Sequence, residues 1–162
     1  MMQDGQIKRK TFIRYLQFYL IKQNSMTENR KDNRGVTIVP TLSVRNAAAA
    51  IEFYKKAFNA HELMRNTSPD GEVVAELSIV NARFVVADEA PEYNNSSPET
   101  LGGTAVRIGL QVTDPDAVAA QAVSAGANEI YPVANQHYGY RLGRIADPYG
   151  HHWEIFAPLH AS

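Results

Sequence analysis

Glu154 is the residue whose position in this sequence most needs a chemical explanation. It stands in the apolar run 152–157, HWEIFA. Alternation places Trp153 and Ile155 on one face of the expected strand, and His152 and Glu154 on the other. A carboxylate in so apolar a strand costs free energy unless it meets a partner or a wet cavity. We therefore expect Glu154 to be either a binding-site residue or an ion-paired structural acid.

His152 and Glu154 are also residue types that ligate metals. Because they lie two positions apart on one strand face, both could reach a single divalent ion such as zinc, nickel, manganese or iron. His151 could not join them, because neighbouring strand residues face opposite ways. The other interpretation of His152 is a residue that is hydrogen-bonded to backbone or to water.

A tight turn and a helix must position this strand. Asp147-Pro148-Tyr149-Gly150 has turn chemistry, because Pro fixes one φ and Gly is free to take a positive one. Asp114 is the expected N-cap of a helix, with Pro115 as its first residue and Gly126 just past its end. The elements predicted in this half are a strand over 106–112, a helix over 115–125, and strands over 129–133, 140–146 and 152–157.

The first half of the chain has the same order of elements. Leu42-x-Val44-x-Asn46 recurs as Leu110-x-Val112-x-Asp114 at the junction of strand and helix. The elements predicted here are a strand over 36–44, a helix over 47–58, and strands over 61–66, 73–79 and 82–88. The repeat predicts two βαβββ modules, 36–89 and 105–158, joined by a linker over 90–104.

Composition narrows the class of protein. The 162 residues are 44% hydrophobic, which suits one domain or two half-size modules, and the absence of cysteine excludes disulfides and thiolate metal sites. Residues 1–35 carry eight Lys/Arg and three Asp/Glu, whereas the remainder carries eight and fourteen. The body is therefore mildly acidic, so no nucleic-acid partner is expected. The lack of cysteine fits the cytoplasmic location that we expect.

Residues 1–35 are expected to form an N-terminal extension outside the fold, and three interpretations of it stay open. Apolar residues among 12–20 with basic neighbours fit an amphipathic helix on a membrane surface, but the run is too short and too charged to span one. A targeting peptide is disfavoured, because Arg14 interrupts the run and no small-residue cleavage site follows. The third is that residues 1–25 lie outside the fold, with Met26 as the real start, and residues 26–35 are expected to be a disordered leader. We expect no membrane partner.

Two motifs carry a resemblance to a known family. They are LSVRNAAAAIEFYKKAFNAHEL in the first half and IADPYGHHWEI in the second. With the doubled βαβββ order, residues 36–158 resemble the vicinal oxygen chelate superfamily, which includes glyoxalase I, extradiol dioxygenases and bleomycin resistance proteins. The resemblance implies an α+β fold whose two modules form an open U-shaped sheet around a cleft, with the helices on the outside. It also implies a homodimer, with exchange of modules between subunits as a variant.

The resemblance further implies where a metal would bind, and most of those positions cannot ligate here. They fall on Val39, Arg107, Val85 (or Val86 in a shifted register) and Glu154. Valine has no donor atom, and arginine is a permanent cation that repels a metal. One ligand is too few, because a zinc site needs three or four. We therefore expect no metal or other cofactor, with a divalent ion held by Glu154 and His152 as the alternative.

Arg107 and Glu154 would both face the implied cleft, within reach of an ion pair. The pair is either structural, or it leaves Arg107 to bind an anionic or carbonyl oxygen of a ligand. The other polar residues expected in the site are Gln111, Thr41, Ser43, Arg141 and His152. The leading hypothesis is a metal-free protein that binds a small organic ligand. The alternative is a metal-dependent lyase, isomerase or dioxygenase in which Glu154 acts as metal ligand or general base.

Overall fold

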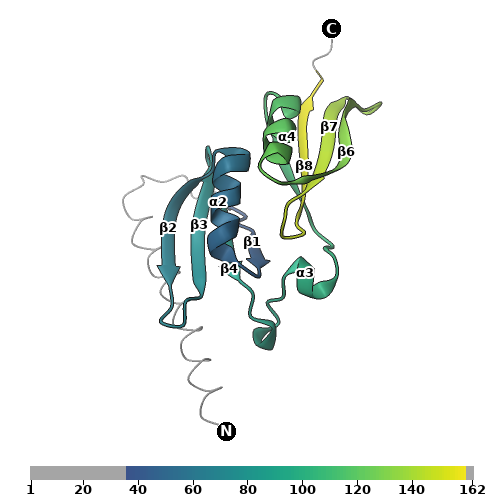
Figure 1. The fold of residues 1–162 in the computed structure, drawn as a ribbon. Coiled ribbons are helices and arrows are strands. Elements are labelled where there is room, and N and C mark those ends of the chain that lie inside the picture. Colours follow the sequence, from purple (N-terminus) through teal and green to yellow (C-terminus); the bar gives the residue numbers. More distant parts are fainter. Residues whose placement is uncertain (1–35, 160–162) are drawn as a thin grey trace. The chain divides into compact units, whose positions relative to one another are not determined.

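The computed structural model describes residues 36–159, and from Val39 onward these belong to one compact unit. The predictions for residues 1–35 lie outside the described residues. The elements are β1 (Thr41–Val44), α2 (Ala47–Phe58), β2 (His61–Thr67), β3 (Val73–Ile79), β4 (Ala82–Asp88), the 3₁₀ turn η1 (Pro91–Tyr93), α3 (Pro98–Leu101), β5 (Arg107–Gln111), α4 (Pro115–Ser124), β6 (Asn128–Asn135), β7 (Tyr140–Ala146) and β8 (His152–Pro158) (Figure 1).

The two halves form two four-stranded sheets with the same topology. The first sheet has the order β1-β4-β3-β2 and the second β5-β8-β7-β6. In each sheet one pair is parallel, β1–β4 or β5–β8, and the other pairs are antiparallel. Helix α2 packs against the first sheet and α4 against the second (Figure 1). The predicted α+β fold of two βαβββ modules is therefore confirmed, and neither sheet closes into a barrel within residues 36–159.

The two longer helices begin and end where their capping residues predict. Asn46 Oδ1 accepts a hydrogen bond from the Ala49 N–H at 3.0 Å, and Asn59 ends α2 in a left-handed conformation with φ 52°. Asp114 caps α4 in the same way, accepting from the Ala117 N–H at 3.0 Å. No helix in residues 36–159 is long and apolar enough to cross a membrane.

Two predicted segments differ in detail from the structure. The strand expected over 36–44 is confined to Thr41–Val44, because Val36 and Ile38 are exposed and no burial holds them in the sheet. The linker expected over 90–104 contains the short turns η1 and α3. Ser97 starts α3, because its Oγ accepts from the Thr100 N–H at 3.3 Å.

Trp153 joins the two modules from the side of β8 that faces the core. Its ring centroid lies 4.7 Å from that of Phe58, and 5.7 and 5.8 Å from those of Tyr54 and Phe84. Trp153 is therefore a core residue packed against a helix, and that helix is α2 of the first module. Helix α2 also contacts α4. These aromatic contacts bring α2 against Trp153 of the second sheet as well as against its own sheet.

A buried carboxylate links the same two modules. Asp147 is only 2% exposed and accepts hydrogen bonds from the Tyr54 hydroxyl at 2.7 Å and from Trp153 Nε1 at 3.0 Å. Its other oxygen accepts from the N–H groups of Tyr149 and His151 at 3.0 and 2.9 Å. Burial, and next the Asp147 charge, raise the pKa of Tyr54 well above its ordinary value, so the hydroxyl remains a donor. The turn before β8 is thus held against α2.

Candidate functional site

The face of the second sheet turned away from α4 carries Arg107 and Glu154. Alternation in β5 buries Leu110 in the core and leaves Arg107 exposed. Alternation in β8 buries Ile155 and places Glu154 on the same side as Arg107. We call this side the outer face; its residues are Arg107, Gly109, Gln111, Tyr131, Tyr140, Leu142, Arg144, His152, Glu154 and Phe156.

Two guanidinium groups hold the Glu154 carboxylate on the outer face. Arg107 Nε lies 3.0 Å from Glu154 Oε1, and Arg144 Nη2 donates to the same oxygen at 2.7 Å. The side chain of Arg107 is 56% exposed, whereas those of Arg144 and Glu154 are 21% and 24% exposed. The expected ion pair of Arg107 and Glu154 is therefore present. Two cations and one anion leave this cluster with a net positive charge; we call these three residues the Arg–Glu cluster.

Arg144 is the member of the cluster that the sequence analysis missed. It lies on β7 as the direct antiparallel neighbour of Glu154 on β8. The turn over 147–150 could have predicted it, because such a turn closes a hairpin between its flanking residues. In the structure the Asp147 N–H donates to the His151 carbonyl oxygen at 2.9 Å. Pairing Asp147 with His151 and counting equally outward along both strands brings Arg144 opposite Glu154.

Aromatic and apolar side chains flank the Arg–Glu cluster on the outer face. The Arg144 guanidinium carbon lies 5.1 Å from the centroid of the Tyr131 ring, and Tyr131 is 56% exposed. Phe156 packs edge-on to Tyr140 at 5.7 Å. Gly109 leaves room for Phe156, because a Cβ at this position would lie 3.2 Å from the phenyl ring. We call Tyr131, Tyr140 and Phe156 the aromatic flank.

The other predicted site residues fall in several places. Gln111 and His152 lie on the outer face, where the register pairs His152 with Arg107. Arg141, expected as a second cation at the site, points to the opposite face of β7. There its guanidinium donates to both oxygens of Asp116 on α4, at 2.5 and 2.6 Å. Alternation along β7 is the reason, because Arg144 and Arg141 are an odd number of positions apart.

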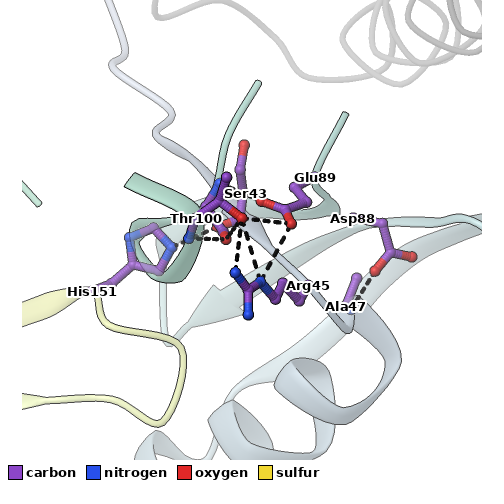
Figure 2. A network of polar contacts seen from close by, with 8 residues as sticks. Ser43, Arg45, Ala47, Asp88, Glu89, Thr100 and His151 are labelled. Atoms are coloured by element: carbon purple, nitrogen blue, oxygen red, sulfur yellow. Dashed lines mark hydrogen bonds and ion pairs between the residues drawn. The ribbon is translucent and has the colours of Figure 1, made fainter. Parts of the chain in front are cut away.

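Thr41 and Ser43 line a pocket that Arg107 and Glu154 do not line. Val106 and Ile108, the sequence neighbours of Arg107, do line it. The pocket has a volume of about 480 Å³. His151 borders it and its Nε2 lies 3.0 Å from the Ser43 carbonyl oxygen (Figure 2). The lining side chains carry no formal charge apart from the titratable His151; they are Pro40, Thr41, Leu42, Ser43, Ser96, Pro98, Leu101, Gly103, Thr104, Ala105, Val106, Ile108 and His151. The predicted site residues are thus divided between two locations.

A polar network holds the linker beside this pocket. Figure 2 shows Arg45 reaching toward both Thr100 and Glu89. Glu89 accepts from the Ser97 N–H and from the Thr100 hydroxyl, each at 2.8 Å. Hydrogen bonds from Ser97 and then Thr100, with the Arg45 charge, lower the pKa of Glu89 to about 2. The network fixes α3 next to the end of β1.

The residues of the Arg–Glu cluster do not fit a divalent metal. Both guanidinium groups lie against one oxygen of Glu154, and their positive charge opposes a cation at this carboxylate. Val85 on β4 has no donor atom. Within the described part of the chain, no group of three or more His, Asp and Glu side chains is placed to hold an ion.

Residues 36–155 match the family model described as Glyoxalase/Bleomycin resistance protein/Dioxygenase superfamily. A relative named "Uncharacterized protein Rv0887c", from Mycobacterium tuberculosis (strain ATCC 25618 / H37Rv), is 39% identical over 140 residues, which cover 82% of each chain. "Uncharacterized protein At5g48480" of Arabidopsis thaliana is 34% identical over 127 residues, covering 72% of this chain and 74% of that one.

Solved structures are similar as well. The X-ray structure of the Arabidopsis thaliana At5g48480 gene product superposes with a TM-score of 0.59 at 27% identity, covering 75% of this chain and 98% of that chain. The fosfomycin resistance protein FosX from Listeria monocytogenes gives a TM-score of 0.62 at 17% identity, with 78% and 95% covered. At this identity the likeness to FosX concerns the fold alone.

Proposed function

Because the chain belongs to the glyoxalase/bleomycin resistance protein/dioxygenase superfamily, we propose that it binds a small organic molecule on the outer face of the second sheet, at the Arg–Glu cluster, without a divalent metal. The observation that carries the proposal is the Glu154 carboxylate, held by Arg107 and Arg144 through the same oxygen. A metal ligand at this position would need a carboxylate that is not already paired with two cations.

Electrostatics supports the metal-free part of the proposal. Two unit charges about 4 Å apart interact by about 4 kcal/mol at the effective dielectric of a protein surface, and a divalent ion doubles that figure. An ion at Glu154 would meet this repulsion from Arg107 and Arg144, while it gained only one carboxylate and one imidazole as protein ligands. Displacing both guanidinium groups would also break the charge-assisted hydrogen bond from Arg144 and the ion pair with Arg107.

A second candidate function is a metal-dependent enzyme with Glu154 as ligand or base. Its support is that His152 and Glu154 lie on one face of β8, two positions apart. Calorimetric titration with nickel, zinc, manganese and ferrous iron separates the two candidates. We expect no stoichiometric binding. A one-to-one complex that is lost in Glu154→Ala and His152→Ala, but kept in the matched control His151→Ala, would contradict the proposal and favour the metal-dependent candidate.

The position of the ligand is tested separately from the metal. A library of small organic probes is added to isotope-labelled protein, and backbone amide shifts are followed by NMR. We expect the shifts to concentrate at β7 and β8, around Arg144 and Glu154, because β5 borders both the outer face and the pocket. Shifts confined to Thr41, Ser43 and the other residues of the pocket would move the binding site away from the outer face and refute its placement there.

A further inference from the structure

The outer face also indicates the chemical class of the ligand, which deepens the proposed function and rests on it. We infer that the ligand is a small aromatic carboxylate, whose carboxyl group is bound by Arg144 and Arg107 and whose ring lies on the aromatic flank. Arg144 is then the ligand-binding residue that determines specificity, and Glu154 is a positioning residue that orients both guanidinium groups.

The charge of the outer face favours an anionic ligand. Arg107 and Arg144 share a single carboxylate, so one positive charge on the outer face is not balanced within the cluster. A ligand with one negative charge neutralises that excess. A phosphate dianion would leave a negative charge beside Glu154, so the balance favours a carboxylate over a phosphate.

Arg144 carries an unsatisfied hydrogen-bond donor. Arg144 Nε is buried and has no hydrogen-bond partner in the described part of the chain. An unpaired buried donor costs about 1–3 kcal/mol, and more where the group is charged. A guanidinium presents its donors as a planar fork that matches the two oxygens of a carboxylate. Only Nη2 of Arg144 is assigned to Glu154, so the Nη1 donors remain for a ligand oxygen. Nε is closed to solvent, so a ligand oxygen would reach it only after a neighbouring side chain moves.

The surface next to the two guanidinium groups is aromatic and apolar. Tyr131 lies against the Arg144 guanidinium and more than half of its surface is exposed. Tyr140 is 38% exposed and contacts Phe156, and Leu142 is the cross-strand neighbour of Phe156. Offset or edge-to-face ring pairs contribute about 0.5–1.5 kcal/mol beyond the area they bury. An aromatic ring attached to the carboxylate would gain these contacts, whereas acetate would not.

The test compares 1-naphthoate with its neutral amide, with 1-naphthyl phosphate and with acetate, all on the full chain at low ionic strength. Calorimetry measures affinity and NMR locates the shifts. We expect naphthoate to bind at the outer face at least about tenfold more tightly than the amide. This ratio is what the loss of one hydrogen bond to a charged group typically causes. We expect naphthoate to bind more tightly than acetate and the phosphate as well, and we expect its affinity to fall as salt is added.

Variants assign the contacts. Arg144→Gln should weaken naphthoate binding about tenfold or more, whereas the matched control Arg141→Gln, on the same strand but paired with Asp116, should leave it unchanged. Glu154→Gln should strengthen naphthoate binding several-fold, because the substitution removes the anion that competes for the two guanidinium groups. A purely structural role for Glu154 would not give this result. If Arg144→Gln fails to fold, Tyr131→Leu and Glu154→Gln carry the test.

Each remaining outcome counts against the inference. Equal binding of amide and carboxylate at the outer face would overturn it and leave the proposed function standing, as would tighter binding of the phosphate or equal losses in Arg144→Gln and Arg141→Gln. If none of the probes, charged or neutral, bound at the outer face, both the inference and the proposed function would be overturned.

Discussion

Replacing Asp147 by alanine should destabilise the protein severely, because this carboxylate is buried and joins the two modules. The change leaves the Tyr54 hydroxyl and Trp153 Nε1 without their acceptor in the core, where both side chains are at most 2% exposed. Each such donor costs about 1–3 kcal/mol. The N–H groups of Tyr149 and His151 lose their acceptor too, but they lie in a turn that water can reach more easily.

The expected loss is therefore about 3–5 kcal/mol, a large part of the 5–15 kcal/mol that holds a typical domain folded. Urea unfolding followed by the fluorescence of Trp153, the sole tryptophan, measures it directly. Asp70→Ala, in the exposed turn between β2 and β3, is the control and should change stability by less than about 0.5 kcal/mol.

A double-mutant cycle sharpens the test. Tyr54→Phe removes one of the two side-chain donors, so Asp147→Ala should cost less in that background than in the wild-type protein. A loss below about 1 kcal/mol for Asp147→Ala, or strictly additive effects in the cycle, would refute the idea that this carboxylate serves buried donors.

Three further predictions concern ionisation and packing. Because burial and Asp147 raise the pKa of Tyr54, the unfolded chain loses this proton near pH 10 while the folded chain keeps it, so the free energy of unfolding should fall as pH rises above 10. Tyr54→Phe should show a shallower fall between pH 9 and 11 in denaturant titrations, and an unchanged slope would contradict this. Since the pKa of Glu89 is lowered to about 2, its stabilisation should be complete above pH 4.5 and be lost as pH falls toward 2. NMR titration of the Ser97 amide should give that pKa, and a midpoint near 4.5 would disprove it. Gly143→Ala should destabilise by about 1–3 kcal/mol, because the new Cβ would lie 2.9 Å from the Val133 backbone nitrogen. An unchanged melting temperature in calorimetry would contradict this and show that β6 and β7 can move apart at little cost.

Elements whose signals are local were predicted well. The helix over 47–58 agrees with the structure at both ends, because an Asn side chain caps one end and an Asn in the left-handed region closes the other. Strand boundaries were less accurate. Nothing in the alternation of 36–44 shows that only Thr41–Val44 pairs with β4, since pairing depends on a partner strand more than forty positions away.

The candidate site was predicted in part. The pairing of Arg107 with Glu154 followed from the family resemblance and is present. Of two arginines on β7, the sequence analysis chose Arg141, whereas Arg144 contacts Glu154. Thr41 and Ser43 lie in a separate pocket with His151, which the analysis had left out of its site.

The doubled βαβββ order, the helix ends and the apolar faces were already determined by the order of residues, because periodicity and capping act within a few positions. Tertiary structure alone decided which distant groups meet: the second guanidinium on Glu154, the hydroxyl of α2 on Asp147, and the indole of β8 on the first helix. Strand register and the packing of one module on the other select these contacts, and both depend on the folded chain as a whole.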